Sequence, residues 1–186
     1  NIQQFVFKEH EGSFLVGMIA AMKSQTGTVG FVGGMDIPLI RKFHGGYEQG
    51  AKYVNPNINV LMNMTGTTPE AWNNPTKGAE LTKAQVDKGA DVVYQAAGGT
   101  GIGVLQAAAD AGIFGIGVDA NQNYMHPGSV LTSMLKRVDV AVYNAFKSTM
   151  DGTYETGVFT LGLAEDGVGW ALDEHNASLI TDEMKE

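Results

Sequence analysis

The hydrophobic positions along this chain follow two spacings. Short apolar runs, typical of buried strands, alternate with longer stretches in which apolar residues recur every three or four positions, as on one face of a helix. The predicted strands are Ile2 to Phe7, Thr28 to Gly33, Ile58 to Met64, Asp91 to Gln95, Phe114 to Asp119, Val130 to Met134, Val158 to Leu161 and Val168 to Ala171. The predicted helices are Phe14 to Lys23, Ile40 to Tyr53, Pro75 to Lys88, Gly101 to Ala111 and Val138 to Met150.

Strands and helices alternate strictly between residues 28 and 120. Such repeats predict a parallel sheet covered on both faces by right-handed crossovers, so we expect a doubly wound α/β fold. We predict one complete lobe over residues 28–126. Residues 1–27 and 127–186 do not extend this regular unit, and we expect them to form part of another lobe together with hinge crossovers. Because a strand begins at Ile2 with no polar leader, we expect a piece of a longer protein.

Composition narrows the range of partners. The 186 residues carry a net charge of −8 with scattered lysines, which disfavours nucleic acid. The absence of cysteine excludes disulfides, thiolate nucleophiles and cysteine-ligated metals. No apolar run reaches the roughly 18 residues that a membrane helix needs. We expect neither a cofactor nor a metal ion.

The stretch "VVYQAAGGTGIGVLQAAADAG" runs from an apolar strand through clustered glycines into a helix. Ligands of open α/β sheets bind beyond the carboxyl ends of the strands, where glycine lets backbone N–H groups approach a ligand. Gly99, Gly101 and Gly103 give GxGxG rather than GxGxxG, and no Walker lysine follows, so a nucleotide cofactor is disfavoured. Two interpretations remain: a tight turn that needs glycine for its geometry, or a site for an uncharged polar ligand such as a sugar.

Four polar or aromatic residues stand near other predicted strand ends. Asp119 ends an apolar strand. It therefore either accepts hydrogen bonds from ligand hydroxyls at a cleft or caps the following turn. Trp72 lies in a polar loop and either stacks on a planar ring or covers the end of the sheet. Lys136 and Arg137 follow the next strand and either line the cleft or form a solvated pair before a helix.

No catalytic constellation is evident in the sequence. The histidines have no metal-ligand spacing, and there is no GxSxG nucleophile elbow. Met35 and Asp36 follow another strand and are further candidates for lining the cleft. A pair of carboxylates, Asp36 and Asp119, across one cleft is the acid–base arrangement left open. We therefore do not expect an enzyme.

Several stretches together carry a family resemblance. They are "FKEHEGSFLVG", "GFVGGMDIPLIRKFHGGYEQGAKYVNP", "DVVYQAAGGTGIGV", "IGVDANQ" and "VLTSMLKRVDVAVY". In this order the chain resembles the basic membrane protein (BMP, Med or PnrA-like) family of ABC-transporter substrate-binding proteins, whose characterised members bind purine or other nucleosides. The resemblance implies a type I periplasmic-binding-protein fold, in which two α/β lobes joined by three crossovers close on the ligand.

The resemblance also implies site residues. Trp72 matches the aromatic that stacks on the base, Gly98, Gly99 and Asp119 match the ribose side, and Lys136 matches a basic ligand contact. Glu11 and Met35 lie in family motifs near the cleft without an assigned contact. The family's opening segment, which supplies the partner aromatic of the base sandwich, has no counterpart in this chain.

The sequence therefore predicts a periplasmic or otherwise extracytoplasmic, membrane-anchored protein that captures a nucleoside, with a purine favoured, for an ABC-transporter permease. One alternative is a nucleoside hydrolase or phosphorylase on a similar cleft. Another is the effector lobe of a transcription regulator. We also expect self-association through residues 1–27 and 138–186, or pairing of these segments with an N-terminal portion of the same protein, because they would otherwise expose strand edges and apolar faces.

Overall fold

A six-stranded sheet forms the body of the protein. The computed structural model describes residues 2–186, and the strand order of this sheet is β3-β2-β4-β5-β6-β8. The first five strands run parallel, and only the edge strand β8 pairs antiparallel. Their bounds are β2 (Thr28–Met35), β3 (Asn59–Gly66), β4 (Val92–Ala96), β5 (Phe114–Asp119), β6 (Val130–Lys136) and β8 (Val168–Trp170).

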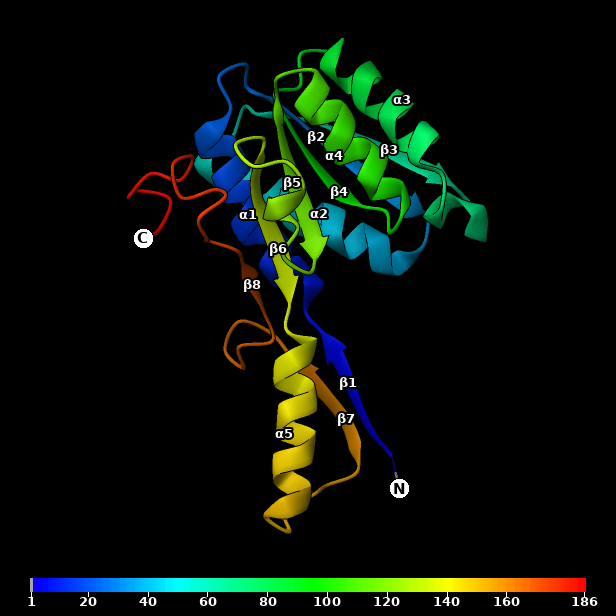
Figure 1. Ribbon diagram of the computed structural model, residues 1–186, viewed down its shortest axis with the longest axis vertical. Coiled ribbons are helices and arrows are strands. Elements are labelled where there is room, and N and C mark those ends of the chain that lie inside the picture. The colour runs from blue at the N-terminus through cyan, green and yellow to red at the C-terminus, as the bar shows by residue number, and fades with distance from the viewer. Residues whose placement is uncertain (1) are drawn as a thin grey trace.

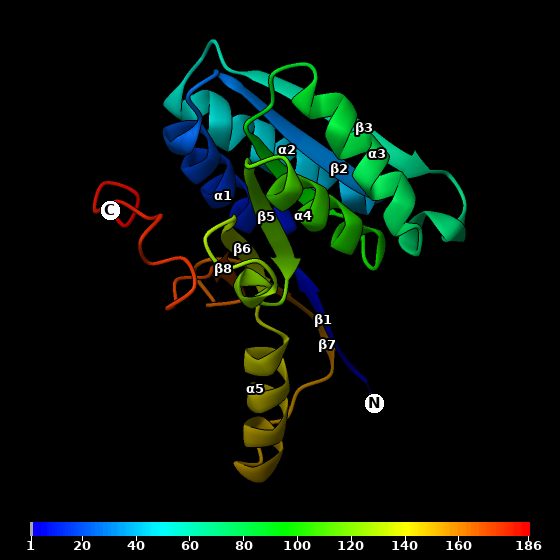
Figure 2. The ribbon, with the colours of Figure 1, turned by 45° about the horizontal axis from the view of Figure 1, so that its top comes forward.

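Two pairs of helices cover the two faces of this sheet. Helices α1 (Glu9–Lys23) and α2 (Pro38–Val54) lie on one face, and α3 (Pro75–Val86) and α4 (Thr100–Asp110) lie on the other (Figures 1 and 2). Successive residues of β2 point to opposite faces, so Phe31 joins the core beneath α1 and α2 while Val32 joins the core beneath α4. The alternation explains why both neighbours are fully buried.

The six-stranded unit extends beyond the predicted range of residues 28–126. Strand β6 pairs with β5, and Leu131 and Met134 of β6 are buried in the same cluster as Val16 and Ile19 of α1. After β8, the C-terminal segment returns to this cluster with Ile180 and Met184. Helix α1 and strands β6 and β8 therefore pack with the complete sheet, contrary to the predicted boundaries, because their apolar faces match its core.

The predicted helices and strands are all present, with shifted ends. Helix α1 begins at Glu9 rather than Phe14, and α2 begins at Pro38 rather than Ile40. The prediction missed two short 3-10 helices, η1 (Pro69–Trp72) and η2 (Asn123–Met125). Within residues 2–186, no helix combines the length and the apolar character that crossing a membrane requires.

A second, smaller region projects from the sheet and is called the arm here (residues 2–7 and 138–161). Strands β1 (Gln3–Phe7) and β7 (Gly157–Leu161) pair in parallel, and helix α5 (Val138–Met150) lies beside them (Figure 1). Three segments of chain connect the arm to the sheet, namely Phe7 to Glu9, Lys136 to Val138 and Leu161 to Val168. Ala141 is the single buried residue of α5. The arm thus contrasts with the sheet, whose strands are covered on both faces.

Candidate functional site

A cavity of about 250 Å³ opens at the carboxyl ends of the central strands. It lies between the start of α2, the loop that carries η1, and the ends of β4, β5 and β6. The residues that line it are Leu39, Ile40, Phe43, Trp72, Ala96, Gly98, Val118, Asp119 and Lys136. Four of the five predicted ligand residues are therefore brought together, and Gly99 lies beside the cavity without lining it.

Trp72 packs its indole ring on the end of the sheet. A side chain at Gly34 would overlap the ring, and one at Gly98 would meet it at 3.5 Å. The Thr100 hydroxyl donates to the carbonyl of Ala71 at 2.8 Å, and the Thr65 hydroxyl donates to the same carbonyl at 2.9 Å. These bonds hold the loop in place. Trp72 is half-buried, so it both covers the sheet end and forms one wall of the cavity.

The glycine turn has a backbone geometry that requires glycine. Gly98 has φ +57, in the left-handed region that side chains disfavour, and it faces the cavity. Gly99 precedes α4 with ordinary helical angles, and a side chain there would lie 3.2 Å from the carbonyl oxygen of Trp72. The turn geometry thus accounts for Gly98. A ligand contact of either glycine stays a prediction.

Asp119 does not cap the turn that follows it. The Oδ1 atom of Asn121 does so instead, accepting a hydrogen bond from the N–H of Asn123 at 3.0 Å, while Oε1 of Gln122 accepts from the N–H of Val118 at 2.9 Å and from Nε2 of Gln95 at 2.8 Å. Asp119 has φ 65, and its side chain is 55% exposed at the cavity. Its Oδ1 lies 3.4 Å from Nζ of Lys136, the side-chain partner it has in the described part of the chain. The carboxylate is thus paired and accessible.

The adjacent residues Lys136 and Arg137 point to different surroundings. Arg137 pairs with Asp139 at 3.0 Å and Asp166 at 3.3 Å on the surface, and the hydrogen bond to Asp139 raises the pKa of the guanidinium. Lys136 is only 20% exposed at its side chain and lines the cavity. Its Nζ also lies 5.7 Å from the ring centre of Phe7 and 5.8 Å from that of Phe43. Only Lys136 fits a ligand contact.

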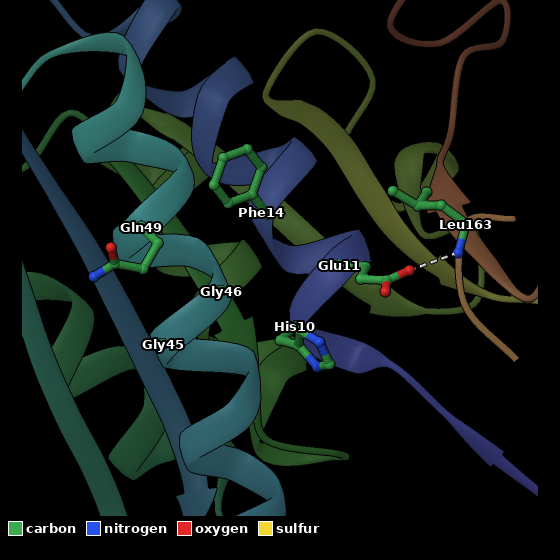
Figure 3. Close-up of a pocket in the computed structure, with 7 residues that line it drawn as sticks. All are labelled: His10, Glu11, Phe14, Gly45, Gly46, Gln49 and Leu163. Atoms are coloured by element: carbon green, nitrogen blue, oxygen red, sulfur yellow. Dashed lines mark hydrogen bonds between the residues drawn. The ribbon is translucent and has the colours of Figure 1, made fainter. Parts of the chain in front are cut away.

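The weaker candidates lie outside this cavity. Asp36 forms two hydrogen bonds with Arg41, both 2.7 Å, and is not among the cavity residues, so the geometry does not pair it with Asp119 across a cleft. Met35, the last residue of β2, does not line the cavity either. Glu11 lines a separate, more apolar cavity of about 330 Å³ between α1, α2 and the segment after β7 (Figure 3). The N–H of Leu163 donates to Glu11 Oε2 at 2.8 Å and lowers the pKa of this carboxyl.

Several cavity residues were missed by the sequence prediction. Leu39, Ile40 and Phe43 belong to the first turns of α2. Because α2 follows β2 directly, its start must lie at the carboxyl edge of the sheet, and this connection was the available signal. Glu9, which lies 3.9 Å from Lys136, gave no signal in the sequence, since the two residues are far apart in the chain.

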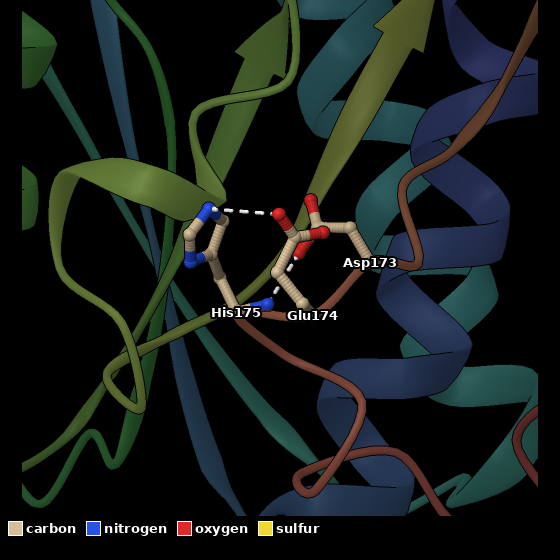
Figure 4. Close-up of side chains that lie close together, drawn as sticks. All are labelled: Asp173, Glu174 and His175. Carbon is tan, nitrogen blue, oxygen red and sulfur yellow. Dashed lines mark hydrogen bonds and ion pairs between the residues drawn. The ribbon is translucent and has the colours of Figure 1, made fainter.

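One group of side chains has metal-ligand spacing among residues 2–186. The ligand atoms of Asp173, Glu174 and His175 lie within 4.8 Å of one another (Figure 4). Asp173 Oδ2 already accepts Nδ2 of Asn121 at 2.6 Å and Nδ2 of Asn123 at 3.0 Å, while Oδ1 accepts the N–H of His175 at 2.8 Å. Burial raises the pKa of Asp173, but these donors outweigh it and leave the pKa below its usual range. The carboxylate thus serves to join two loops.

Solved structures with the same architecture define the class of protein. A solute-binding protein of an ABC transporter system from Aeropyrum pernix K1 superposes with a TM-score of 0.81 and 35% identity, covering 94% of this chain and 51% of that chain. A transcriptional activator of the comK gene from Bacillus halodurans has a TM-score of 0.86 and 26% identity, covering 99% of this chain and 61% of that chain. The α/β architecture predicted for a type I periplasmic-binding-protein fold is confirmed, with one lobe as the main unit.

Sequence comparison then gives the family. Residues 1–186 match the family of PnrA-like ABC transporter substrate-binding proteins, and the chain belongs to it. Basic membrane protein D of Borreliella burgdorferi is 38% identical over 94% of this chain and 51% of its own length. An uncharacterised lipoprotein of Pyrococcus abyssi is 40% identical over 93% of this chain and 45% of its own length. The chain thus spans about half the length of these curated relatives.

Proposed function

We propose that the protein to which this chain belongs captures a nucleoside, with a purine favoured, and delivers it to the permease of an ABC transporter. The observation that carries this proposal is the meeting of Trp72, Gly98, Asp119 and Lys136 around one cavity at the strand ends. Family membership supports the delivery step, because substrate-binding proteins of this family serve ABC transporters.

Each wall of the cavity suits one part of a nucleoside. The flat face of Trp72 suits the base, and such stacking contributes about 1–3 kcal/mol per base. The exposed carboxylate of Asp119 has two acceptor oxygens for the two hydroxyls of a ribose. Lys136 adds a donor beside it, 3.4 Å away. The apolar residues from α2 exclude water from the base.

A binding role is favoured over nucleoside hydrolysis or phosphorolysis. Asp119 is the carboxylate among the cavity residues, and Asp36 is engaged by Arg41 elsewhere. The other titratable residue that lines the cavity is Lys136, and it is held in an ion pair with Asp119 at 3.4 Å rather than set apart from it as a second acid or base. Chromatography of nucleoside incubated with the protein should therefore show no free base, and release of base would establish the enzymatic alternative.

The similarity to a comK activator supports a second candidate, the effector lobe of a transcription regulator. The two candidates differ in the rest of the protein. A lipoprotein signal ahead of this chain in its gene would support the transporter role, and a helix-turn-helix segment would support the regulator. The name of the Pyrococcus abyssi relative leads us to propose an extracytoplasmic, lipid-anchored protein.

We further propose that the arm does not stay uncovered. Val142, Tyr143, Phe146 and Met150 of α5 are exposed, as is Val158 of β7. An apolar face beside open strand edges associates readily in water. In the full protein the arm would pack with the remaining part of the chain, and residues 1–186 alone would self-associate. Light scattering that finds a stable monomer of 19.7 kDa would contradict self-association.

Equilibrium binding to the full-length protein tests the proposed function. Tritiated inosine, adenosine, guanosine and cytidine are each dialysed against it. Saturable binding of at least one purine nucleoside is expected, displaced by the unlabelled compound. Absence of binding for all four would overturn the nucleoside proposal.

A further inference from the structure

Glu9 is a buried carboxylate that no part of the proposed function has yet used. It is the first residue of α1 and is 5% exposed. Its Oε2 atom is buried without a hydrogen-bond partner in the described structure, and its Oε1 atom lies 3.9 Å from Nζ of Lys136. Burying a charge is costly unless it is paired. The start of a helix stabilises a carboxylate only in part, so Lys136 is the counter-charge that Glu9 requires.

Lys136 is therefore shared between two carboxylates. Glu9 lies on its buried side, and Asp119 lies 3.4 Å away on the cavity side. The rings of Phe7 and Phe43 lie within cation–π distance of the ammonium group. One cation between two carboxylates gives this cluster a formal net charge of −1. Lys136 is thus not a free anion-binding group.

We propose that Glu9 positions Lys136 and, together with Asp119, neutralises it, so that the cavity accepts an uncharged nucleoside and rejects its phosphorylated form. This inference rests on the proposed function. A phosphate monoester carries a charge of about −1.5 to −2 at pH 7, and it would meet a cluster that is already negative. Without Glu9, the ammonium of Lys136 would have only Asp119 as a partner, and this neutral pair would no longer repel the phosphate.

The first experiment compares the binding of two probes, inosine and inosine 5′-monophosphate. Calorimetric titration of the full-length protein gives the affinity ratio of the two compounds. In Glu9→Gln, which keeps the shape and removes the charge, the preference for inosine should fall about tenfold. The matched control is Glu80→Gln, which removes the carboxylate of the exposed Lys77–Glu80 pair, 3.2 Å long, on α3. An unchanged ratio in Glu9→Gln, or an equal fall in Glu80→Gln, would overturn the inference.

A second experiment needs no nucleoside, so it tests the positioning role of Glu9 separately from the proposed nucleoside binding. Lysines are acylated with acetyl N-hydroxysuccinimide ester at one fixed pH, and peptide mass spectrometry gives the rate at Lys136. Glu9→Gln should raise that rate several-fold while Lys77 stays constant, and Glu80→Gln should affect Lys77 alone. Should the wild type bind no nucleoside yet show this acylation pattern, the proposed function fails and the positioning role of Glu9 stands.

A shorter carboxylate provides a further variant for the case in which Glu9→Gln does not fold. Glu9→Asp keeps the charge at the start of α1 but withdraws it from Lys136. The acylation rate of Lys136 should then rise by a smaller factor, and inosine should remain preferred over its monophosphate. A rate equal to that of the wild type in this variant would overturn the positioning role.

Discussion

The six-stranded sheet and the arm are built from the same kinds of element, yet they differ in what covers them. Phe31, Tyr94 and Leu131 of the sheet are fully buried between helices. In the arm, Phe146 is 69% exposed and Met150 is 86% exposed. A sheet with helices on both faces completes its own core, whereas two strands with one helix bury only one side. The comparison shows that the core of the protein lies in the sheet, and it leads us to predict that most of the stability comes from there.

The largest expected effect comes from a direct contrast of one aromatic residue in each region. Phe31→Ala removes a ring that packs edge-on against Tyr94 at 5.5 Å, and it should lower the free energy of unfolding by about 3–5 kcal/mol. In a dissociated monomer of residues 1–186, Phe146→Ala should change it by less than about 0.5 kcal/mol, as at other exposed positions. Urea denaturation followed by circular dichroism measures both. A comparable loss at Phe146 would mean that the arm is covered in solution.

A smaller effect is expected when the cavity wall of the sheet is changed. Trp72→Ala should weaken the binding of a purine nucleoside by about 1–3 kcal/mol through loss of stacking. Calorimetry on the full-length protein measures the change. Leu163→Ala, at the connection outside the cavity, is the control and should bind as the wild type does. If the affinity survives the loss of Trp72, its role is to cover the sheet end over Gly34.

The pairing of Asp119 with the ribose can be tested with a modified ligand. Asp119→Asn leaves one acceptor oxygen in place of two, so binding should weaken by about 1–2 kcal/mol. A 2′,3′-dideoxynucleoside lacks the hydroxyls that would donate hydrogen bonds to this carboxylate. The mutation should therefore cost little further affinity for the dideoxynucleoside. Titration of both ligands against both proteins completes the cycle. If the loss of affinity from Asp119→Asn and the loss from removing the ribose hydroxyls add in full, Asp119 does not contact those hydroxyls.

The smallest expected effect is a pH dependence that belongs to the sheet. His44 packs against Phe31 with ring centres 5.3 Å apart, and burial lowers its pKa. Between the unfolded pKa, about 6.5, and the lower folded value, the unfolded chain binds more protons. The sheet should therefore lose stability as the pH falls through this window and lose no more below it. In His44→Gln, the midpoint of urea denaturation should no longer depend on pH within this window. If the dependence persists in the variant, another group causes it.

The outline of the site was predictable because its residues occupy strand ends. Asp119 ends an apolar run and Gly98 opens the glycine turn, and the carboxyl ends of parallel strands meet at one edge. Leu39 and Phe43 were missed because their helical spacing identifies them equally well as core residues. Asp36 was a reasonable candidate from its position, but Arg41, five residues later on α2, engages it.

The sequence by itself determined the helices and strands, their alternation and the family, because these depend on the spacing and identity of residues near one another in the chain. The tertiary structure decided that β6 and β8 join the six-stranded sheet and that α1 packs against it, since this depends on which apolar faces meet. It also decided that Lys136 turns to Glu9 and Asp119 while its neighbour Arg137 turns to the surface. Charge pairing depends on distances of a few ångströms between residues far apart in the chain, and only folding sets those distances.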